Sequence, residues 1–305
     1  MRYRTAGKMA KIISVGNISM GGTGKTPFTI MLAKHFISQG KKVCILSLGY
    51  KGRVGYETNV ISDGKEILIG PDRAADEPYM MAVNCPEAVV ITGKERVRSY
   101  EYAEKHFKPD IYLLDDGFQH KRMKRDIDIC LLDHKRPVST GFMFPFGYLR
   151  EPASGLGRAD VVVFTRAASD TVPEKAAKYV ADKPVFFCDV KYMGLYGING
   201  KADIDLKGKK VCAFAGIASP SKFFKFVKAQ GAELLVKKIY SDHHLYNGRE
   251  TYVVERKARE LEADIIVTTE KDYVKLPEDV QENCYYLKIE IELRNSDKFF
   301  ELIDK

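Results

Sequence analysis

The chain has 305 residues, 45% of them hydrophobic and 30% charged, which is the composition of an ordinary soluble globular protein with one large or two medium domains. No stretch approaches the about 18 consecutive apolar residues of a membrane span, and the N-terminal sequence MRYRTAGKMAK lacks the apolar core of a signal peptide. The net charge of +8 favours anionic partners such as nucleotides, phosphorylated lipids or an acidic membrane surface, and it is equally consistent with a role in solubility alone.

The first half of the chain alternates short β-branched runs with amphipathic stretches of helical length, such as 95–107. This alternation predicts a parallel sheet wrapped by helices. The expected strands are Ile12–Val15, Val43–Leu48, Val89–Thr92, Ile111–Leu114, Ile127–Leu132 and Val161–Thr165. A polar stretch bracketed by prolines, between Arg166 and Pro184, predicts a boundary between a first domain of residues 1–168 and a second of residues 169–305.

A second α/β series follows, and its last helix is a candidate to pack back on the first domain. Its clearest helix begins at Ser219 as N-cap, has Pro220 in the first turn and stops at Gly231. On that helix Phe223, Phe224 and Val227 form a stripe typical of a core face. The expected strands are Val185–Phe187, Val211–Ala215, Leu234–Ile239, Ile265–Thr268 and Tyr285–Ile289. The predicted fold class is α/β throughout.

A glycine-rich loop, SMGGTGKT, lies between the first strand and a helical run. Small residues let backbone N–H groups close around phosphate, and the N-terminus of the following helix adds positive partial charge. The loop predicts nucleotide binding, with a plain turn as the alternative; Ser19 stands where the usual pattern has glycine. The residues expected to bind nucleotide are Ser19, Met20, Gly21, Gly22, Thr23, Gly24, Lys25 and Thr26. Lys25 would reach the β- and γ-phosphates, and the Thr26 hydroxyl would bind Mg²⁺.

A second cluster, LLDDGFQHKRMKRD, places Asp115 and Asp116 at the C-terminal end of an apolar strand. In doubly wound sheets ligands bind at this edge, so the carboxylates would face the same crevice as the glycine-rich loop. A magnesium role and a turn-capping role are both open, and the metal role is favoured. His120 follows, and then a basic run that is either a solvated loop or a source of phosphate contacts: Lys121, Arg122, Lys124 and Arg125.

Three further segments carry polar groups suited to a site. ADEPY puts Asp76 and the neighbouring Glu77 at the start of a helix, with a simple helix cap as the alternative. FPFGYLREP carries Arg150 and Glu151 in a stretch too rich in proline and glycine for regular structure. SDHHLY holds Asp242, His243 and His244 after a strand of the second half, and such a histidine pair is more often surface than catalytic.

These motifs, GNISMGGTGKTP, ADEP, DDGFQH, LREP, SDH and TEKD in this order, resemble those of the tetraacyldisaccharide 4'-kinase (lipid A 4'-kinase) family over residues 11–275. The resemblance implies ATP-dependent phosphorylation of the 4'-hydroxyl of tetraacyldisaccharide 1-phosphate to give lipid IVA, with Mg²⁺. It implies a P-loop kinase-like α/β/α sandwich and a smaller second α/β/α domain around a cleft. The expected workplace is the cytoplasmic inner face of the inner membrane, with the lipid as partner, no nucleic acid and no obligate protein partner.

The resemblance also implies roles for individual residues. Lys25, Asp76 as base and His243 assisting from the second domain would be catalytic, so domain closure would be part of catalysis. The metal centre would comprise Thr26, Asp115, Asp116 and Glu151. The residues matching positions near the substrate are Tyr50, Arg96, His120 and Arg150.

Two departures from the family pattern concern membrane contact and the substrate. Family members usually begin with an apolar, membrane-associating helix, whereas here only a basic segment of about ten residues precedes the first strand. Leu48 stands where the family commonly has arginine. Two segments are expected to reach a lipid. One is the basic N-terminus, with Arg2, Arg4, Lys8 and Lys11. The other is an apolar loop with Phe142, Met143, Phe144 and Phe146, for which core packing and lipid contact are equally open.

Two rival functions remain open from the sequence. A partitioning-type switch ATPase also uses a GGTGKT loop, but it usually carries a signature lysine where this chain has Met20, and it needs neither ADEP nor LREP. A kinase of another sugar is the second rival, because no motif identifies the acceptor. Six cysteines without metal-like spacing predict reduced, buried thiols, as in a reducing cytoplasm: Cys44, Cys85, Cys130, Cys188, Cys212 and Cys284.

Overall fold

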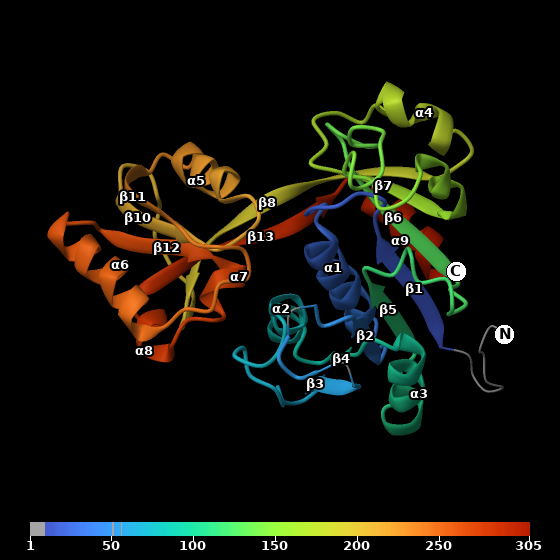
Figure 1. Cartoon of the computed structure of the whole chain (residues 1–305), viewed down its shortest axis with the longest axis horizontal. Helices are drawn as coiled ribbons and strands as arrows, with labels where there is room; N and C mark the ends of the chain where they lie inside the picture. Colours follow the sequence, from blue (N-terminus) through green and yellow to red (C-terminus); the bar gives the residue numbers. More distant parts are fainter. Residues whose placement is uncertain (1–9, 51, 56) are drawn as a thin grey trace. The chain divides into compact units, whose positions relative to one another are not determined.

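The computed structural model describes residues 10–305 apart from positions 51 and 56 (Figure 1). Contacts divide the chain into two compact units. The second unit comprises Lys191–Glu290, and the first comprises the chain up to Val190 together with Ile291–Lys305. The chain leaves the first unit within β8 (Val185–Gly197) and returns within β13 (Cys284–Leu293). The sequence places the domain boundary earlier, after residue 168; the polar stretch that follows forms α4 (Glu174–Val180), whose buried side chains pack in a core of the first unit.

The first unit is built on a parallel sheet. Starting from β8, the strand order is β8, β7 (Val161–Thr165), β6 (Ile127–Asp133), β1 (Lys11–Gly16), β5 (Ile111–Asp115), β2 (Val43–Ser47), β4 (Val89–Thr92) and β3 (Asn59–Asp63), which forms the edge. The six strands predicted from β-branched runs in this half are confirmed to within one residue at each end. β3, which pairs antiparallel with β4, has too weak an apolar pattern to have been predicted.

Helices cover both faces of this sheet (Figure 1). One face packs against α1 (Lys25–Ser38), α2 (Asp76–Asn84) and α9 (Ser296–Asp304), and the other against α3 (Arg96–His106), the 3₁₀ helix η1 (Ala153–Arg158) and α4. Alternate strand residues serve the two cores, so Ile13 lies on the first face and Ile12 on the second. Strands buried on both faces explain why the sequence shows continuous apolar runs here.

The last helix, α9, completes the core of the first unit. Phe299 and Ile303 are fully buried, and the Phe299 ring meets Phe28 of α1 edge-on at 5.8 Å between centroids. Lys11 Nζ donates to the carbonyl oxygen of Ile303 at 2.5 Å, and partial burial lowers the pKa of this lysine despite nearby Asp304. Lys11 is therefore engaged within the fold. The other basic residues of the N-terminus, Arg2, Arg4 and Lys8, lie outside the described residues.

The second unit repeats the pattern on a smaller scale. Its parallel strands run in the order β11 (Glu233–Ile239), β10 (Lys210–Ala215), β12 (Ile265–Thr269) and β13, and β9 (Gly200–Lys201) folds back on the end of β8. One face packs against α5 (Pro220–Ala229), and the other against α6 (Gly248–Glu260), α7 (Glu270–Tyr273) and α8 (Glu278–Gln281). Ser219 occupies the N-cap position of α5, and the Phe223, Phe224 and Val227 stripe is buried, as predicted.

The prediction for the cysteines is confirmed. All six cysteines are buried and carry free thiols. Across residues 10–305, leaving aside positions 51 and 56, the structure contains no helix that is both long and apolar enough to traverse a bilayer.

Candidate active site

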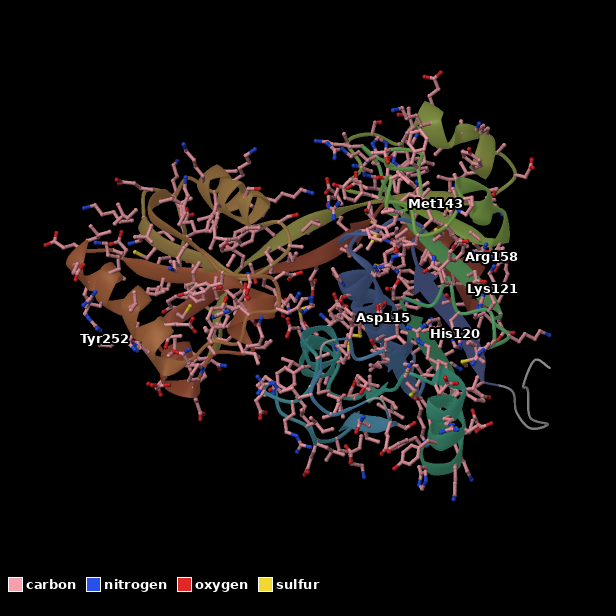
Figure 2. The ribbon with its side chains drawn as sticks, viewed as in Figure 1. Asp115, His120, Lys121, Met143, Arg158 and Tyr252 are labelled. Carbon is pink, nitrogen blue, oxygen red and sulfur yellow. The ribbon has the colours of Figure 1, made fainter. Side chains whose placement is uncertain are left out.

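The glycine-rich loop and the aspartate pair leave the sheet side by side. β1 and β5 are paired in parallel, with Val15 opposite Asp115, so both strands end at the same edge. The loop then leads from β1 into α1, whose first helical residue is Lys25. Figure 2 shows Asp115 at the end of β5, next to α1. This is the edge where parallel α/β sheets bind their ligands.

Glycines shape the loop in two ways. Gly21 and Gly24 have φ values of 101° and 88°, a region that side chains rarely adopt, and a Cβ atom at either position would meet nothing within 4 Å. The loop is therefore open above its backbone, where an anion would bind. Gly16 serves close packing instead, because a Cβ there would lie 2.5 Å from the Cβ of Phe118. Phe118 belongs to the DDGF segment, so this contact fixes the two motifs against each other.

Lys25 extends from the start of α1 toward the aspartate pair. Its Nζ lies 3.6 Å from Asp116 Oδ1 and 3.5 Å from Asn17 Oδ1. Asn17 in turn donates to the Thr23 hydroxyl at 3.0 Å, which ties the two ends of the loop together. The ammonium group of Lys25 thus stands between the loop and a carboxylate, where it can pair with an incoming anion.

Asp116 is an ion-paired carboxylate. Arg150 Nη1 lies 2.7 and 2.8 Å from the two carboxylate oxygens of Asp116. The backbone of Asp116 is in the left-handed region, with φ of 51°. Burial alone would raise the pKa of Asp116, but the positive charges of Lys25 and Arg150 outweigh burial and lower the pKa below its usual value. Asp116 is therefore ionised and draws two cations to the loop.

Asp115 differs sharply from its neighbour. Its side chain is buried; Oδ2 accepts a hydrogen bond from Ser47 at 3.2 Å, and Oδ1 has no hydrogen-bond partner among the described residues. Burial, together with the negative charges of Glu77 and Asp116, raises the pKa of Asp115 to about 7 against the opposing effect of Lys25. A buried carboxyl with an orphan oxygen among like charges is characteristic of a site that awaits a cation.

Arg96 supports this corner from beneath. The guanidinium is almost completely buried at the start of α3 and donates to the carbonyl oxygen of Asp116 at 3.0 Å and to that of Asp115. Burial lowers the pKa of Arg96, and the charges of the two aspartates oppose that shift. These hydrogen bonds hold the backbone of the aspartate pair.

Glu151 is held by two donors. Gln119 Nε2 donates to Glu151 at 2.8 Å, and Arg158 Nη2 approaches it at 2.8 Å. Gln119 also donates to the Asn17 carbonyl oxygen at 2.7 Å, which joins the LREP segment to the glycine-rich loop. Among the described residues, no three or more His, Cys, Asp or Glu side chains are arranged to hold a metal ion.

His120 and the basic run occupy different surroundings. Burial lowers the pKa of His120 to about 4, aided by the positive charges of Arg96, Arg125 and Arg122. Arg125 is turned into the fold, where it pairs with Asp128 at 2.8 Å and donates to the His120 carbonyl oxygen. The outer members of the run, Lys121, Arg122 and Lys124, are exposed, which agrees with the solvated-loop reading.

Asp76 and Tyr50 lie on elements that follow β2. Asp76 is buried and is the first residue of α2, directly after Ala75 at the N-cap position. Tyr50 follows β2 and is largely exposed, and Leu48 is exposed beside it. Both apolar side chains are thus available at the C-terminal edge of the sheet.

The second unit carries the SDH and TEKD motifs together. His243 Nε2 lies 3.5 Å from Asp242 Oδ2, and Lys271 Nζ lies 3.1 Å from Asp242 Oδ1. The His243 backbone is in the left-handed region with φ of 65°, and its N–H donates to the Gly216 carbonyl oxygen at 3.2 Å. The loop after β11, which carries Asp242 and His243, is thereby fastened to the loop after β10 and to α7.

Sequence reasoning missed four residues that build the first unit's site. Asn17 and Gln119 stand inside recognised motifs and could have been chosen as amides flanking a phosphate loop. Ser47 reaches Asp115 from 68 residues away, and Arg158 reaches Glu151 over seven residues that include η1; no local pattern marks either residue.

A parallel sheet with a glycine-rich loop between β1 and α1, and a carboxylate pair after the neighbouring strand, defines a P-loop kinase-like protein. The tetraacyldisaccharide-1-P 4'-kinase (LpxK) family model matches residues 3–305. The chain therefore belongs to the tetraacyldisaccharide 4'-kinase family.

Similar proteins extend along almost the entire chain. The tetraacyldisaccharide 4'-kinases of Syntrophus aciditrophicus and Desulfatibacillum aliphaticivorans are 37% and 38% identical to it, over 99% and 97% of this chain and 85% and 83% of theirs. The crystal structure of LpxK from Aquifex aeolicus in complex with ATP is 31% identical, covers 97% of this chain and 88% of that one, and superposes with a TM-score of 0.80. The predicted family and fold class are confirmed.

Proposed function

We propose that this chain transfers the γ-phosphoryl group of ATP to the 4'-hydroxyl of tetraacyldisaccharide 1-phosphate, giving lipid IVA in lipid A biosynthesis. The observation that carries the proposal is the family match over residues 3–305, with the glycine-rich loop, Lys25 and the aspartate pair gathered at one sheet edge. Phosphoryl transfer needs alignment and charge neutralisation more than covalent chemistry, and this edge supplies both. No specific observation favours the switch ATPase or a kinase of another sugar.

The phosphates of ATP would lie in the open concavity of the glycine-rich loop. Backbone N–H groups at residues 21–26 and the N-terminus of α1 would bind their oxygens. Lys25 would exchange its 3.6 Å contact with Asp116 for the β- and γ-phosphates. The charge developing during transfer is thereby met by groups already fixed in position.

The donor set also fits Mg²⁺. The cation prefers oxygen ligands, and the Thr26 hydroxyl and the orphan Oδ1 of Asp115 are of this kind. Asp116 and Glu151 would complete the set after exchanging partners, because Arg150, Gln119 and Arg158 now hold them. When bound, the cation supplies charge neutralisation at the phosphate oxygens.

Asp76 is the proposed base. A sugar hydroxyl is a poor nucleophile at neutral pH, and a positioned carboxylate that accepts its proton contributes roughly 10²- to 10⁴-fold in rate. We propose that His243 assists Asp76 in accepting the proton. Tyr50, Arg96 and His120 are proposed to lie near the substrate. The proposed place of reaction is the inner face of the inner membrane.

The test is transfer of labelled γ-phosphate to tetraacyldisaccharide 1-phosphate in detergent micelles. Wild type should form product, and Asp76→Asn should form it roughly 10²- to 10⁴-fold more slowly while retaining ATP affinity. The exposed Asp72, changed to Asn, is the matched control and should behave as wild type. ATP hydrolysis or nucleotide-dependent dimerisation without lipid product would contradict the proposal.

A further inference from the structure

The segment between β6 and η1 displays apolar side chains to solvent. Residues 142–148, here called the aromatic loop, expose the side chains of Phe142 (67%), Met143 (47%), Phe144 (66%), Phe146 (89%) and Tyr148 (62%). Figure 2 labels Met143 in the first unit. Core packing, one of the two readings that the sequence left open, is therefore wrong for this loop. A run of large exposed apolar side chains marks an interaction surface.

The aromatic loop has a defined backbone shape. Phe144 N–H donates to the Leu149 carbonyl oxygen at 2.9 Å, Gly147 N–H to that of Met143 at 2.9 Å, and Leu149 N–H to that of Phe142 at 3.1 Å. A Cβ at Gly147 would overlap the Phe142 carbonyl oxygen, so glycine permits the tight return. The side chains are thus presented outward by a pre-formed turn, which lowers the entropy lost on binding.

Backbone hydrogen bonds join the aromatic loop directly to the glycine-rich loop. Met20 N–H donates to the Tyr148 carbonyl oxygen at 2.6 Å, and Arg150 N–H donates to that of Ile18 at 2.8 Å. Met20 is itself exposed and adds to the apolar surface. A surface that binds the aromatic loop is consequently held next to the phosphate site.

Charge identifies the kind of partner. The sequence from His134 to Arg150, HKRPVSTGFMFPFGYLR, contains no aspartate or glutamate. Lys135 and Arg136 at its start are exposed, whereas Arg150 at its end pairs with Asp116. Exposed apolar side chains that closely follow exposed cations in the chain match a bilayer that has anionic headgroups outside and acyl chains beneath.

We propose that the aromatic loop inserts into the surface of an anionic lipid bilayer and holds the phosphate site at that surface. Phe142, Phe144 and Phe146 enter the acyl boundary, while Lys135 and Arg136 contact the headgroups. The purpose of this insertion rests on the proposed function, since a kinase of an acylated disaccharide must meet its acceptor in a membrane. Insertion itself is measurable without catalysis.

The chain contains no tryptophan, so one introduced tryptophan reports on its own position. Phe146→Trp is mixed with vesicles containing equal amounts of phosphatidylglycerol and phosphatidylcholine. Its emission should shift to the blue, and brominated acyl chains should quench it. Tyr252→Trp, at an exposed position on α6, is the matched control and should show neither change (Figure 2). Absence of a shift and of quenching at position 146 overturns the proposal.

A sedimentation measurement on the same vesicles tests the contribution to binding. Phe142→Ser/Phe146→Ser should bind the vesicles about 100-fold more weakly than wild type, because each phenylalanine that no longer enters the apolar phase weakens binding about tenfold. The exposed pair on α6, changed as Tyr252→Ser/Val253→Ser, should bind as wild type. Equal vesicle binding by the two double variants overturns the proposal. The proposal is also overturned if the wild-type protein self-associates without lipid and only Phe142→Ser/Phe146→Ser abolishes that self-association.

Activity measurements separate this inference from the proposed function. Phe142→Ser/Phe146→Ser should retain turnover on detergent-dispersed substrate and lose it on substrate embedded in vesicles. A wild type that transfers phosphate in detergent but fails to bind vesicles leaves the function intact and overturns the inference. Normal insertion of the Phe146→Trp protein, combined with a wild type that never phosphorylates the lipid, supports the inference and contradicts the function.

Discussion

Two buried aspartates, one in each unit, have opposite surroundings. Asp272 lies directly after β12 and has Lys275 Nζ at 3.2 Å, the Thr269 hydroxyl at 2.7 Å and the Gly216 N–H at 2.9 Å. Asp115, at the end of β5, accepts one hydrogen bond from Ser47. Among the residues that the structure describes, the Oδ1 atom of each aspartate accepts no hydrogen bond, so what distinguishes Asp272 is the ammonium group of Lys275 beside its Oδ1. Both side chains are buried, so exposure does not distinguish them.

The difference shows how burial serves structure in one unit and chemistry in the other. A buried carboxylate with a cation and several donors is compensated within the fold, and removing one partner leaves an uncompensated charge. A buried carboxylate beside like charges is compensated only when something binds. The first unit therefore gives up stability at Asp115, and the second unit holds its SDH and TEKD loops together through Asp272.

The largest effect is expected at Lys25. Lys25→Met removes the cation between the glycine-rich loop and Asp116, so turnover in the transfer assay should fall by about 10³-fold or more. The free energy of unfolding in urea should change by less than about 1 kcal/mol, because the lysine belongs to the site and not to a core. The exposed Lys41, changed to Met, should leave both quantities unchanged. A Lys25→Met protein that turns over normally would remove this residue from the proposed machinery.

The Asp272–Lys275 pair should matter for stability. Lys275→Met leaves the buried Asp272 without its cation and should lower the free energy of unfolding by about 3 to 5 kcal/mol. Replacing both partners, as Asp272→Asn/Lys275→Met, should recover much of that loss, because no buried charge remains. Urea denaturation followed by circular dichroism measures both. If the double variant were as unstable as the single one, the charge argument for the second unit would be wrong.

His120 should produce a smaller, pH-dependent effect. Its pKa is lowered to about 4, mainly by burial, against about 6.5 when unfolded. The unfolded chain thus binds the additional proton between these values, so the stability contributed by this group is present above about pH 6.5 and is lost as pH falls toward 4. The stability difference between pH 7.5 and pH 5 should shrink by about 1 kcal/mol in His120→Gln, after allowing for solvent screening of the half-buried ring. The exposed His106, changed to Gln, should leave that difference unaltered.

Strong local patterns made much of the fold predictable. The continuous apolar runs from Val43 to Thr165 gave the central strands because both faces of the sheet are covered. The weakly apolar β3 was missed, and α6 was also missed although Asn247 and Glu250 form a capping box at its start.

The site was predictable only where a motif adjoins a strand. Lys25, Asp115 and Asp116 follow β1 and β5, and their shared sheet edge follows from parallel pairing. Ser47 joins through tertiary packing, which leaves no trace in local sequence. Arg158 joins because η1 brings it back to Glu151 seven residues earlier, and no motif marks that short helix. The sequence also left the aromatic loop undecided, because Phe142 and Phe146 look alike in a core and in a lipid contact.

The most direct test of the contrast between the two aspartates is the pair of isosteric changes Asp115→Asn and Asp272→Asn. Each protein is assayed for lipid phosphorylation and for its free energy of unfolding at pH 7.5. Asp115→Asn should lose turnover by about 10²-fold or more and unfold with equal or higher free energy, by up to about 3 kcal/mol, since a poorly compensated charge is removed. Asp272→Asn should be destabilised by about 3 kcal/mol or more. A destabilised Asp115→Asn that still phosphorylates the lipid would contradict the account.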